Sequence, residues 1–330
     1  AIVGGRNIGN PYFGFGEHYN FRDMEVVTAG PVTEDISDSF DLYWNDDWAV
    51  TGEAFSPPGH KPPDIAASRE ALRSEIREMQ VFEQAGLEDQ LRYQQLLPEL
   101  VDASDTGDVW VVYDDPPTAV ENDTGVRKVD KLQGISKSFK HDLVIASAYF
   151  IPDDNFVANL RALTERGVRV RIITNSLAST NHTMVNSGYT PWRRRLLEAG
   201  VELFEYRGDI ADTGGIVAPG NNGHAVTLHT KAFVVDNETV YIGSLNMDPR
   251  SLHINTEMGL LIRDPGLASE VMRALQRDMQ PENAWRVSLN EDNGLVWEST
   301  AGTVHLQPAR SFGQRLADFL YGLLPIKDQL

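Results

Sequence analysis

The spacing of apolar residues differs between the two halves of this 330-residue chain, and it is more regular in the second half. From residue 128 onward, short apolar runs alternate with stretches in which apolar residues recur every three to four positions. The runs predict strands at 143–150, 168–174, 201–206, 240–242 and 256–262, and a strand-like segment that carries residues 229 and 231 before a turn at 236–238. The longer periods predict helices at 130–140, 155–166 and 192–199. Such alternation is typical of an α/β fold, in which helices pack on a sheet.

The first 125 residues are less regular. Residues 2–50 have the pattern of strands and turns followed by a helix at 34–44, and 51–63 are rich in Gly and Pro, as linkers are. Residues 68–97 predict a helix and 109–113 a short strand. Near the other end, apolar residues of 311–324 fall mostly on one helical face.

Composition removes several classes of function. The chain has no cysteine, which excludes disulfides, thiolate catalysis and Cys-ligated metals. Its net charge of −19 argues against broad binding to nucleic acid, which normally uses a basic surface. No apolar run approaches the ~20 residues that a membrane helix needs. No metal-ligand spacing or Gly-rich nucleotide loop is present either, so we expect no metal and no cofactor.

One stretch combines polar groups at short, fixed spacings. His229 and Lys231 lie two apart on a strand-like segment, so both side chains should leave the same face. Asp236 follows in a predicted hairpin turn, and a second turn carries Ser244 and Asn246. The next predicted strand has a carboxylate, Glu257, at its start. The pattern therefore predicts one pocket with an imidazole, an ammonium, a hydroxyl, an amide and a carboxylate.

This set of groups suits phosphoryl transfer. A histidine can attack phosphorus or protonate a leaving oxygen. Lysine, serine and asparagine can bind the non-bridging oxygens on which negative charge lies in the transition state. A carboxylate such as Glu257 can hold the second imidazole nitrogen and fix its tautomer. Each residue alone has an ordinary structural explanation, and Asp236 in particular is as well explained as the cap of a hairpin turn.

The order His-x-Lys-x4-Asp followed by Gly-Ser-x-Asn resembles the HKD motif of the phospholipase D superfamily. The resemblance implies a two-lobed α/β fold in which each lobe supplies one His-Lys pair to a shared, metal-independent site. One histidine becomes phosphorylated, and the other serves as acid and then base. Matched by position, His229 and Lys231 are the pair, Ser244 and Asn246 line the phosphate site, and Glu257 supports His229.

A second, partial copy of this unit lies at the N-terminus. Residues 1–8 align with 240–247 when Gly4 is set on Gly243, and 23–26 align with 257–260. Asn7 then corresponds to Asn246, and Asp23 to the supporting Glu257, as the presumed partner of the first copy's histidine. The alternative is a chance similarity of two strand–turn–strand units.

The spacing of the two copies also predicts where the other His-Lys pair belongs. His229 lies 14 residues before Gly243, and the same spacing from Gly4 gives a position about eleven residues before Ala1. We therefore expect a first lobe cut after its catalytic strand, and little or no activity from these residues alone.

Further segments resemble bacterial cardiolipin synthase-like proteins: Gly-Gly-Arg-Asn-Ile-Gly at 4–9, Tyr-Phe-Gly at 12–14 and Ser-Ala-Tyr-Phe-Ile-Pro at 147–152. The resemblance implies two pseudo-symmetric lobes of mixed sheet flanked by helices, the first incomplete. The chain then divides into the remainder of the first lobe (1–50), a linker and helical insert (51–125), the second lobe (126–265) and a C-terminal helical extension (266–330).

This family implies a phosphatidyltransferase that makes cardiolipin-type phospholipid, placed peripherally on the bacterial cell membrane. Its partners would be a phospholipid substrate and a membrane surface. The alternatives are a phospholipase D hydrolase or nuclease of the same fold, and a non-catalytic fragment that binds phosphate or lipid headgroups. The helix at 311–324 is a candidate membrane contact, or a terminal helix docked on the core. His182 and Tyr189 are candidates for the substrate entrance.

Overall fold

The computed structural model describes residues 1–57, 59, 61, 63–78, 98–100, 102, 104–121, 132, 138–210 and 225–324. Two compact units are distinguished: one joins Ala1–Trp44 to Gly107–Leu330, and the other is Asn45–Thr106. In the smaller unit, the described residues form η2 (Gly52–Phe55) and α2 (Ile65–Glu78). Residues 79–97 of the helix predicted there lie outside the described residues.

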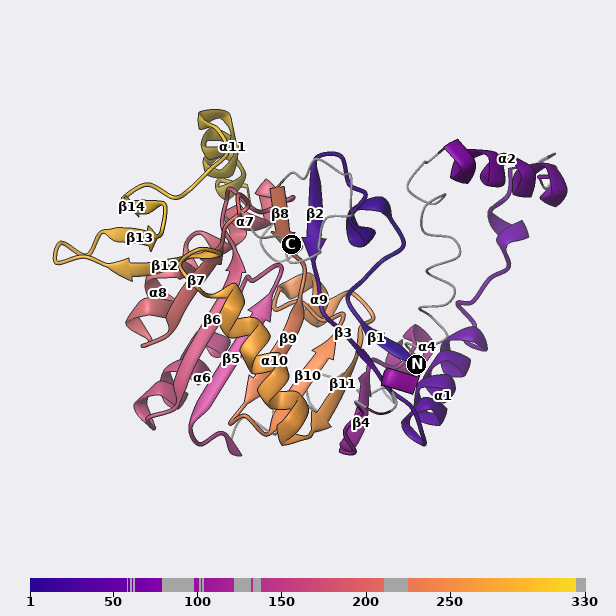
Figure 1. Cartoon of the computed structure of the whole chain (residues 1–330), viewed down its shortest axis with the longest axis horizontal. Coiled ribbons are helices and arrows are strands. Elements are labelled where there is room, and N and C mark those ends of the chain that lie inside the picture. The colour runs from indigo at the N-terminus through magenta and orange to yellow at the C-terminus, as the bar shows by residue number, and fades with distance from the viewer. Residues whose placement is uncertain are drawn as a thin grey trace. The chain divides into compact units, whose positions relative to one another are not determined.

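The larger unit is built on one mixed sheet, to which ten of the described strands belong (Figure 1). The predicted strands are present, and a parallel segment of three lies at its centre. In spatial order the strands are β14 (Gly302–Val304), β13 (Leu295–Ser299), β12 (Ala284–Leu289), β7 (Glu202–Tyr206), β6 (Arg169–Asn175), β5 (Asp142–Ser147), β9 (Lys231–Val235), β10 (Thr239–Gly243), β11 (Met258–Arg263) and β4 (Asp108–Tyr113).

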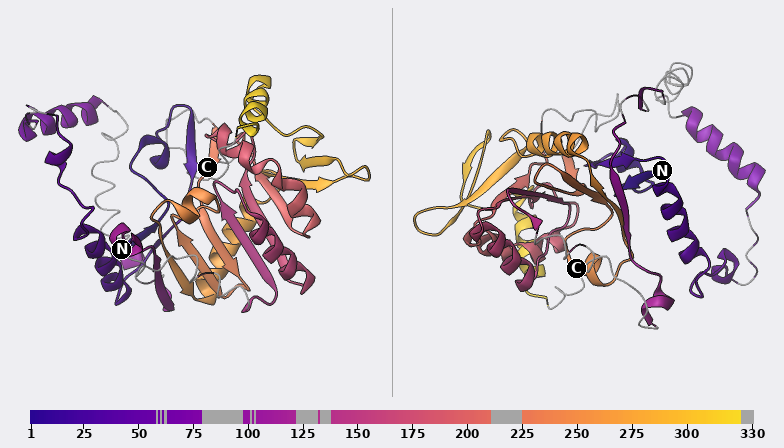
Figure 2. Two further views of the ribbon diagram at one scale, coloured as in Figure 1. Left: turned by 180° about the vertical axis from the view of Figure 1, so that it is seen from behind. Right: turned by 90° about the horizontal axis from the view of Figure 1, so that it is seen from below.

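Helices cover both faces of this sheet (Figure 2). On one face α10 (Pro265–Asp278) packs Val271, Met272 and Leu275 against alternate residues of the central strands. On the other face lie three further helices, whose apolar residues join the larger core cluster. They are α6 (Asp154–Glu165), α7 (Thr183–Tyr189) and α8 (Trp192–Glu198). The central strands are apolar on both faces because both are covered.

The C-terminal region differs from the sequence prediction of a helical extension for 266–330. Besides α10 and α11 (Phe312–Gly322) it contains β12, β13 and β14, which extend the sheet beyond β7. The prediction was wrong because it gave no weight to the apolar–polar alternation within Ala284–Leu289, where Trp, Val and Leu alternate with Arg and Ser as in a half-buried strand. The predicted helix at 130–140 lies largely outside the described residues.

The two repeats predicted from the sequence form ribbons with the same register. In the first ribbon, β1 (Ile2–Gly4) pairs antiparallel with β3 (Glu25–Val27), and Gly4 faces Glu25. In the second, β10 pairs antiparallel with β11, and Gly243 faces Gly259. These are the partners that the sequence alignment superimposed, which confirms that the similarity extends to strand pairing.

A short parallel pair joins the two repeats. Here β2 (Tyr19–Arg22) lies alongside β8 (Ala225–Leu228), with Arg22 opposite Leu228. The backbone N–H of His229 then donates to the carbonyl of Arg22 at 2.7 Å. This register brings Asp23, the residue after β2, level with His229, the residue after β8.

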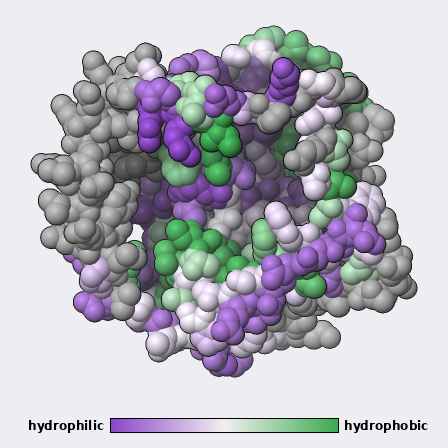
Figure 3. All heavy atoms as spheres, turned by 90° about the vertical axis from the view of Figure 1, so that its right-hand side faces the viewer, coloured by the Kyte–Doolittle hydropathy of each residue, from purple (hydrophilic) through white to green (hydrophobic). Residues whose placement is uncertain are grey.

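The remaining helices of the larger unit are short or peripheral. They are η1 (Asn10–Phe13), α1 (Val32–Trp44), α4 (Pro117–Glu121) and α9 (Pro249–His253). None of the helices in the described part of the chain combines the length and apolar character that a membrane crossing demands. Figure 3 shows one face of the molecule, where hydrophilic side chains form a diagonal band with hydrophobic side chains gathered above it.

Candidate active site

His229 and Lys231 lie side by side and are both buried where the two repeats meet. The His229 side chain is 7% exposed, and Lys231 is 5% exposed. Lys231 Nζ donates to the His229 carbonyl at 2.7 Å and lies 3.1 Å from Nδ1 and 3.2 Å from Nε2 of the ring. The sequence prediction that an imidazole and an ammonium project to the same side is confirmed.

The carboxylate that holds His229 is Asp23, not Glu257. Asp23 Oδ2 accepts a hydrogen bond of 2.7 Å from Nδ1 of the imidazole, and the carboxylate is fully buried. The sequence assigned Glu257 to His229 and Asp23 to a histidine of the first repeat. The assignment of Asp23 was wrong, because the parallel pairing of β2 with β8 places it beside His229, a histidine 206 residues away.

The hydrogen bond to Asp23 fixes the state of the ring. Because a carboxylate only accepts, Nδ1 carries the proton and Nε2 of the neutral ring is left unprotonated, as an acceptor. Burial lowers the pKa of His229, the Asp23 hydrogen bond opposes that change, and Lys231 adds to the lowering. The lowered pKa favours the neutral ring, which is the form in which an imidazole acts as a nucleophile or general base.

The pKa of the Lys231 ammonium is much lower than that of an ordinary lysine. Burial lowers its pKa to about 8, although the charges of Asp23, Glu257 and Asp248 raise it. Close packing contributes to this burial, since a Cβ added at Gly5 would lie 3.1 Å from Lys231 Cδ and 3.3 Å from Nζ. A buried ammonium among carboxylates is costly for folding, and such perturbed groups mark functional sites.

Glu257 belongs to a neighbouring part of the pocket. Ser244 Oγ donates a short hydrogen bond to its carboxylate, and Asn255 Nδ2 donates a second of 3.2 Å. The backbone N–H of Glu257 donates to Asp114 Oδ2 at 3.2 Å, which ties β11 to the end of β4. Within the described residues no histidine contacts Glu257, so this carboxylate is oriented without an imidazole partner.

The two predicted asparagines lie on different repeats. Asn246 Oδ1 accepts from the backbone N–H of Tyr149 at 3.4 Å, and its side chain is buried. Asn7 is exposed, and its Nδ2 donates to the hydroxyl of Tyr12 at 3.1 Å. Asn7 therefore reaches the pocket through Tyr12.

Asp236 lies at the opposite end of β9 from the pocket. Its backbone has a φ of 52°, as in the turns that join short hairpins, and its carboxylate accepts from three backbone N–H groups of residues 140–142 at 2.7–2.9 Å. The alternative given for this residue, a structural cap, is the arrangement that the structure shows. Asp236 braces β5 against the hairpin.

Tyr12 is the site residue that the sequence did not single out. Its hydroxyl lies 3.5 Å from His229 Nε2, and its ring meets the imidazole edge-on at a centroid distance of 5.1 Å. Phe21 covers another side of the imidazole at 4.7 Å. Its position in the sequence could have indicated this role. Tyr12 lies between Asn7 and Asp23, in a segment that is longer than its counterpart in the second repeat.

Of the two entrance candidates, only His182 lies near the pocket. Its ring meets that of Tyr149 edge-on at 5.6 Å, and the hydroxyl of Tyr149 donates to Asn181. Tyr189 is buried and donates to Glu205 in the core, so the prediction that it lines the entrance was wrong.

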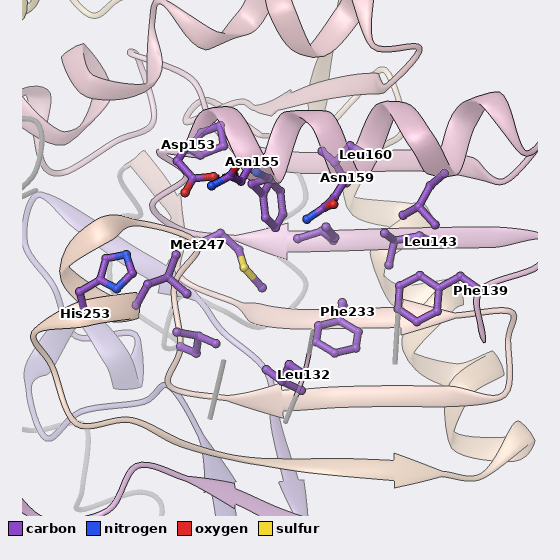
Figure 4. Close-up of a pocket in the computed structure, with 16 residues that line it drawn as sticks. Leu132, Phe139, Leu143, Asp153, Asn155, Asn159, Leu160, Phe233, Met247 and His253 are labelled. Atoms are coloured by element: carbon purple, nitrogen blue, oxygen red, sulfur yellow. Dashed lines mark hydrogen bonds between the residues drawn. The ribbon is translucent and has the colours of Figure 1, made fainter. Parts of the chain in front are cut away.

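A separate apolar cavity of about 250 Å³ lies between α6 and the sheet (Figure 4). Leu143, Phe233 and Leu160 line it together with Met247 and His253, and His229 and Lys231 are not among its lining residues. Within the described residues, no group of three or more His, Asp, Glu or Cys side chains is arranged to hold a metal ion.

The comparisons with known proteins agree with this geometry. A family model described as "Cardiolipin synthase, PLD-like domain" matches residues 132–279. Cardiolipin synthase C of Escherichia coli (strain K12) is 32% identical over 340 residues, which cover 99% of this chain and 70% of that protein. Cardiolipin synthase A of Pseudomonas entomophila (strain L48) is 29% identical over 279 residues, covering 84% of this chain and 44% of its own length.

A solved structure supports the fold. The crystal structure of phosphatidylserine synthase from Haemophilus influenzae Rd KW20 matches the whole chain and 68% of its own, with a TM-score of 0.56 and 17% identity. An uncharacterized protein of Helicobacter pylori (strain J99 / ATCC 700824) is 26% identical, and the chain spans 64% of its length. With its mixed sheet, paired repeats and match to a cardiolipin synthase, the chain belongs to the phospholipase D superfamily, in its cardiolipin synthase-like family.

Proposed function

We propose that this chain forms part of a phosphatidyltransferase that makes cardiolipin-type phospholipid by phosphodiester exchange. The relatives named cardiolipin synthase supply the substrate class. The observation that carries the chemistry is the hydrogen bond between Asp23 and His229 Nδ1, with Lys231 beside the ring. This arrangement leaves Nε2 as the imidazole nitrogen available to a phosphate.

The transfer needs two histidine roles. In one, an imidazole nitrogen bonds to phosphorus and the bond from phosphorus to the leaving headgroup oxygen breaks. In the other, an imidazolium gives its proton to that oxygen. The resulting neutral ring then takes the proton of the acceptor hydroxyl as its oxygen bonds to phosphorus and the phosphorus–nitrogen bond breaks, which frees the first histidine. His229 Nε2 performs one of these roles, and a histidine from outside the described residues performs the other.

Lys231 and the amide and hydroxyl groups would hold the phosphate. Protonated Lys231 offers charge to the non-bridging oxygens, where transition-state charge is greatest. We expect Ser244 and Asn246 of the second repeat to bind these oxygens as well, and Asn7 to contribute from the first repeat next to Tyr12. Glu257 is a positioning residue for the other histidine, as Asp23 is for His229, since the two carboxylates occupy matching places in ribbons of one register.

This proposal requires a second His-x-Lys for turnover. The test compares the 330-residue chain with a version that also carries the residues its own coding sequence supplies before Ala1. We expect diphosphatidyl product from labelled phosphatidylglycerol with the longer version only, and negligible turnover from residues 1–330. Release of phosphatidate without diphosphatidyl product would show a hydrolase instead, and full activity of the 330-residue chain would contradict the need for a second pair.

Trapping the intermediate assigns the role of His229. Rapid quenching of the active protein with labelled donor, followed by digestion, identifies the peptide that carries the acid-labile phosphorus–nitrogen bond. Label on the peptide with His229 assigns it as the nucleophile, and label on another histidine assigns it as the acid and base. Label on no histidine, with turnover intact, would exclude the covalent route.

A further inference from the structure

The amphipathic helix α11 is mounted with its apolar face outward. Its six large apolar residues recur at helical spacing on the exposed side: Phe312, Leu316, Phe319, Leu320, Leu323 and Leu324, between 43% and 77% exposed. The polar Asp318, in contrast, is only 4% exposed. Helices on soluble surfaces normally place these two faces the other way round.

Polar contacts hold α11 in this orientation. Asp318 accepts from Gln307 Nε2 at 2.8 Å, and Thr190 Oγ1 lies 3.4 Å from the same carboxylate oxygen. Gln314 Nε2 donates to the carbonyl of Leu177 at 2.6 Å. Arg315 Nε donates to the carbonyl of Gln307 at 3.1 Å. These bonds fix the polar face of α11 to the protein. The apolar face, which would normally pack on a core, is therefore exposed.

The exposed stripe carries no charge. Its side chains are Phe and Leu alone, and the two charged residues of α11, Arg315 and Asp318, are both bonded to the protein side. Such a surface offers no hydrogen-bonding or charged group to a polar partner. Single exposed apolar residues are common on protein surfaces, but a continuous apolar stripe usually marks a site of interaction.

The stripe lies at the end of the molecule that holds the active site. Helix α11 packs on α7, which begins directly after His182, the residue whose ring meets Tyr149. Two further exposed apolar residues, Ile8 and Phe13, flank Tyr12 at the imidazole. Figures 1 and 2 show α11 and the segment between β1 and β2 projecting from the same end of the larger unit.

We propose that the apolar stripe of α11, with Ile8 and Phe13, enters the outer layer of a phospholipid bilayer and sets the catalytic pocket against the lipid phosphates. The inference rests on the proposed function, which requires the pocket to reach lipids. An uncharged stripe on a protein of net charge −19 fits a lipid surface through apolar burial, because the overall charge argues against attraction to anionic headgroups.

Vesicle flotation tests the surface. We expect the full 330-residue chain to bind vesicles of pure phosphatidylcholine, with little change at high salt. The double substitution Phe319→Gln with Leu323→Gln should lower the vesicle affinity by about tenfold or more, since it removes two large side chains from the lipid phase. The matched control, Ile2→Gln with Val27→Gln, removes two exposed apolar side chains that face each other on the β1–β3 ribbon and should leave binding unchanged.

Because the chain has no cysteine, a single probe site can be introduced. A nitrobenzoxadiazole label on Leu320→Cys should shift its emission to the blue and brighten when vesicles are added, and the same label on Val27→Cys should not. Equal thermal unfolding temperatures of the labelled and unlabelled proteins show that α11 remains folded. Equal shifts at both positions, or at neither, would overturn the proposal.

The outcomes separate this inference from the proposed function. Binding needs no turnover, so His229→Gln should bind vesicles as well as the unsubstituted chain does. Transfer in detergent micelles without any vesicle binding would contradict the membrane-binding role of the stripe and would still support the proposed function. Self-association that the Phe319→Gln, Leu323→Gln pair abolishes, seen by light scattering without vesicles, would instead assign the stripe to a contact between copies of the chain.

Discussion

The β1–β3 and β10–β11 ribbons have the same strand register but support the active site differently. Asp23, next to the first ribbon, bonds to His229, which comes from the other repeat. Glu257, its counterpart beside the second ribbon, bonds to Ser244 and Asn255 instead. The histidine of the second repeat therefore depends on a carboxylate from the first repeat, and we propose that Glu257 serves a histidine of the first repeat in the same way.

The largest losses of transfer activity are expected when either of the two carboxylates is replaced. In the active, longer protein, Asp23→Asn should lower transfer by about 10³–10⁴-fold, because the imidazole loses the acceptor that fixes its tautomer. Glu257→Gln should have an effect of the same order through the other histidine. The steady-state rate with labelled phosphatidylglycerol measures both.

Thermal unfolding provides the control for these two variants, because each substitution changes one atom and should leave the fold intact. A Glu257→Gln protein with full activity would contradict the matched roles of the two carboxylates.

Lys231 sharpens the comparison because it lies between the two carboxylates. Replacing it with Met should lower transfer by about 10²–10³-fold, since the site loses its cation. The same change should stabilise the fold by up to roughly 3 kcal/mol at pH 7, because a pKa lowered from 10.5 to about 8 reflects the cost of burying the charge. Urea unfolding measures the gain, and a large loss of stability would contradict the account.

The pH dependence follows from the same lysine. Below about pH 8 the ammonium is charged, and above it binding of an oxyanion such as tungstate should weaken by about tenfold per pH unit. Between about pH 8 and 10.5 the unfolded chain binds more protons than the folded chain at this position, so stability should rise with pH there.

Lys231→Arg is the control for the pH effect, because a guanidinium stays charged throughout this range. Calorimetric titration of tungstate at a series of pH values measures the dependence. A decline of the same steepness in the Arg variant would assign it to another group.

Gly5 gives the smallest effect and the most direct contrast between the ribbons. The second ribbon carries Ser244 at this position, whereas a Cβ at Gly5 would press on the end of the Lys231 side chain. Gly5→Ala should therefore weaken tungstate binding by only a few fold, with little change in unfolding temperature, because a flexible side chain can yield by a few tenths of an ångström. A change in stability without a change in binding would contradict this explanation.

Much of the central sheet could be predicted from the sequence because its signals are local. The β9–β10 hairpin followed from apolar runs around Asp236 and Asn237, which both adopt positive φ. The repeat alignment correctly superimposed Gly4 on Gly243 because strand, glycine and turn recur in the same order.

The partners of the site could not be predicted in the same way. The pairing of Asp23 with His229 depends on a parallel contact between strands 206 residues apart, which leaves no local pattern. The apolar face of α11 was visible as a period, but its direction depends on Gln307, Thr190 and Leu177, which bond to the polar side. Tertiary contacts decided both cases.

The tautomer and titration of His229 directly test whether Asp23, and not Glu257, is the carboxylate that holds this imidazole. In the 330-residue chain, nitrogen-15 NMR should show a neutral ring at pH 7 with the proton on Nδ1 and an unprotonated Nε2, which follows from the bond to Asp23. Asp23→Asn should change the tautomer balance and titration of this histidine, and Glu257→Gln should leave both nearly unchanged. A proton on Nε2, or a response to Glu257→Gln and not to Asp23→Asn, would contradict the account.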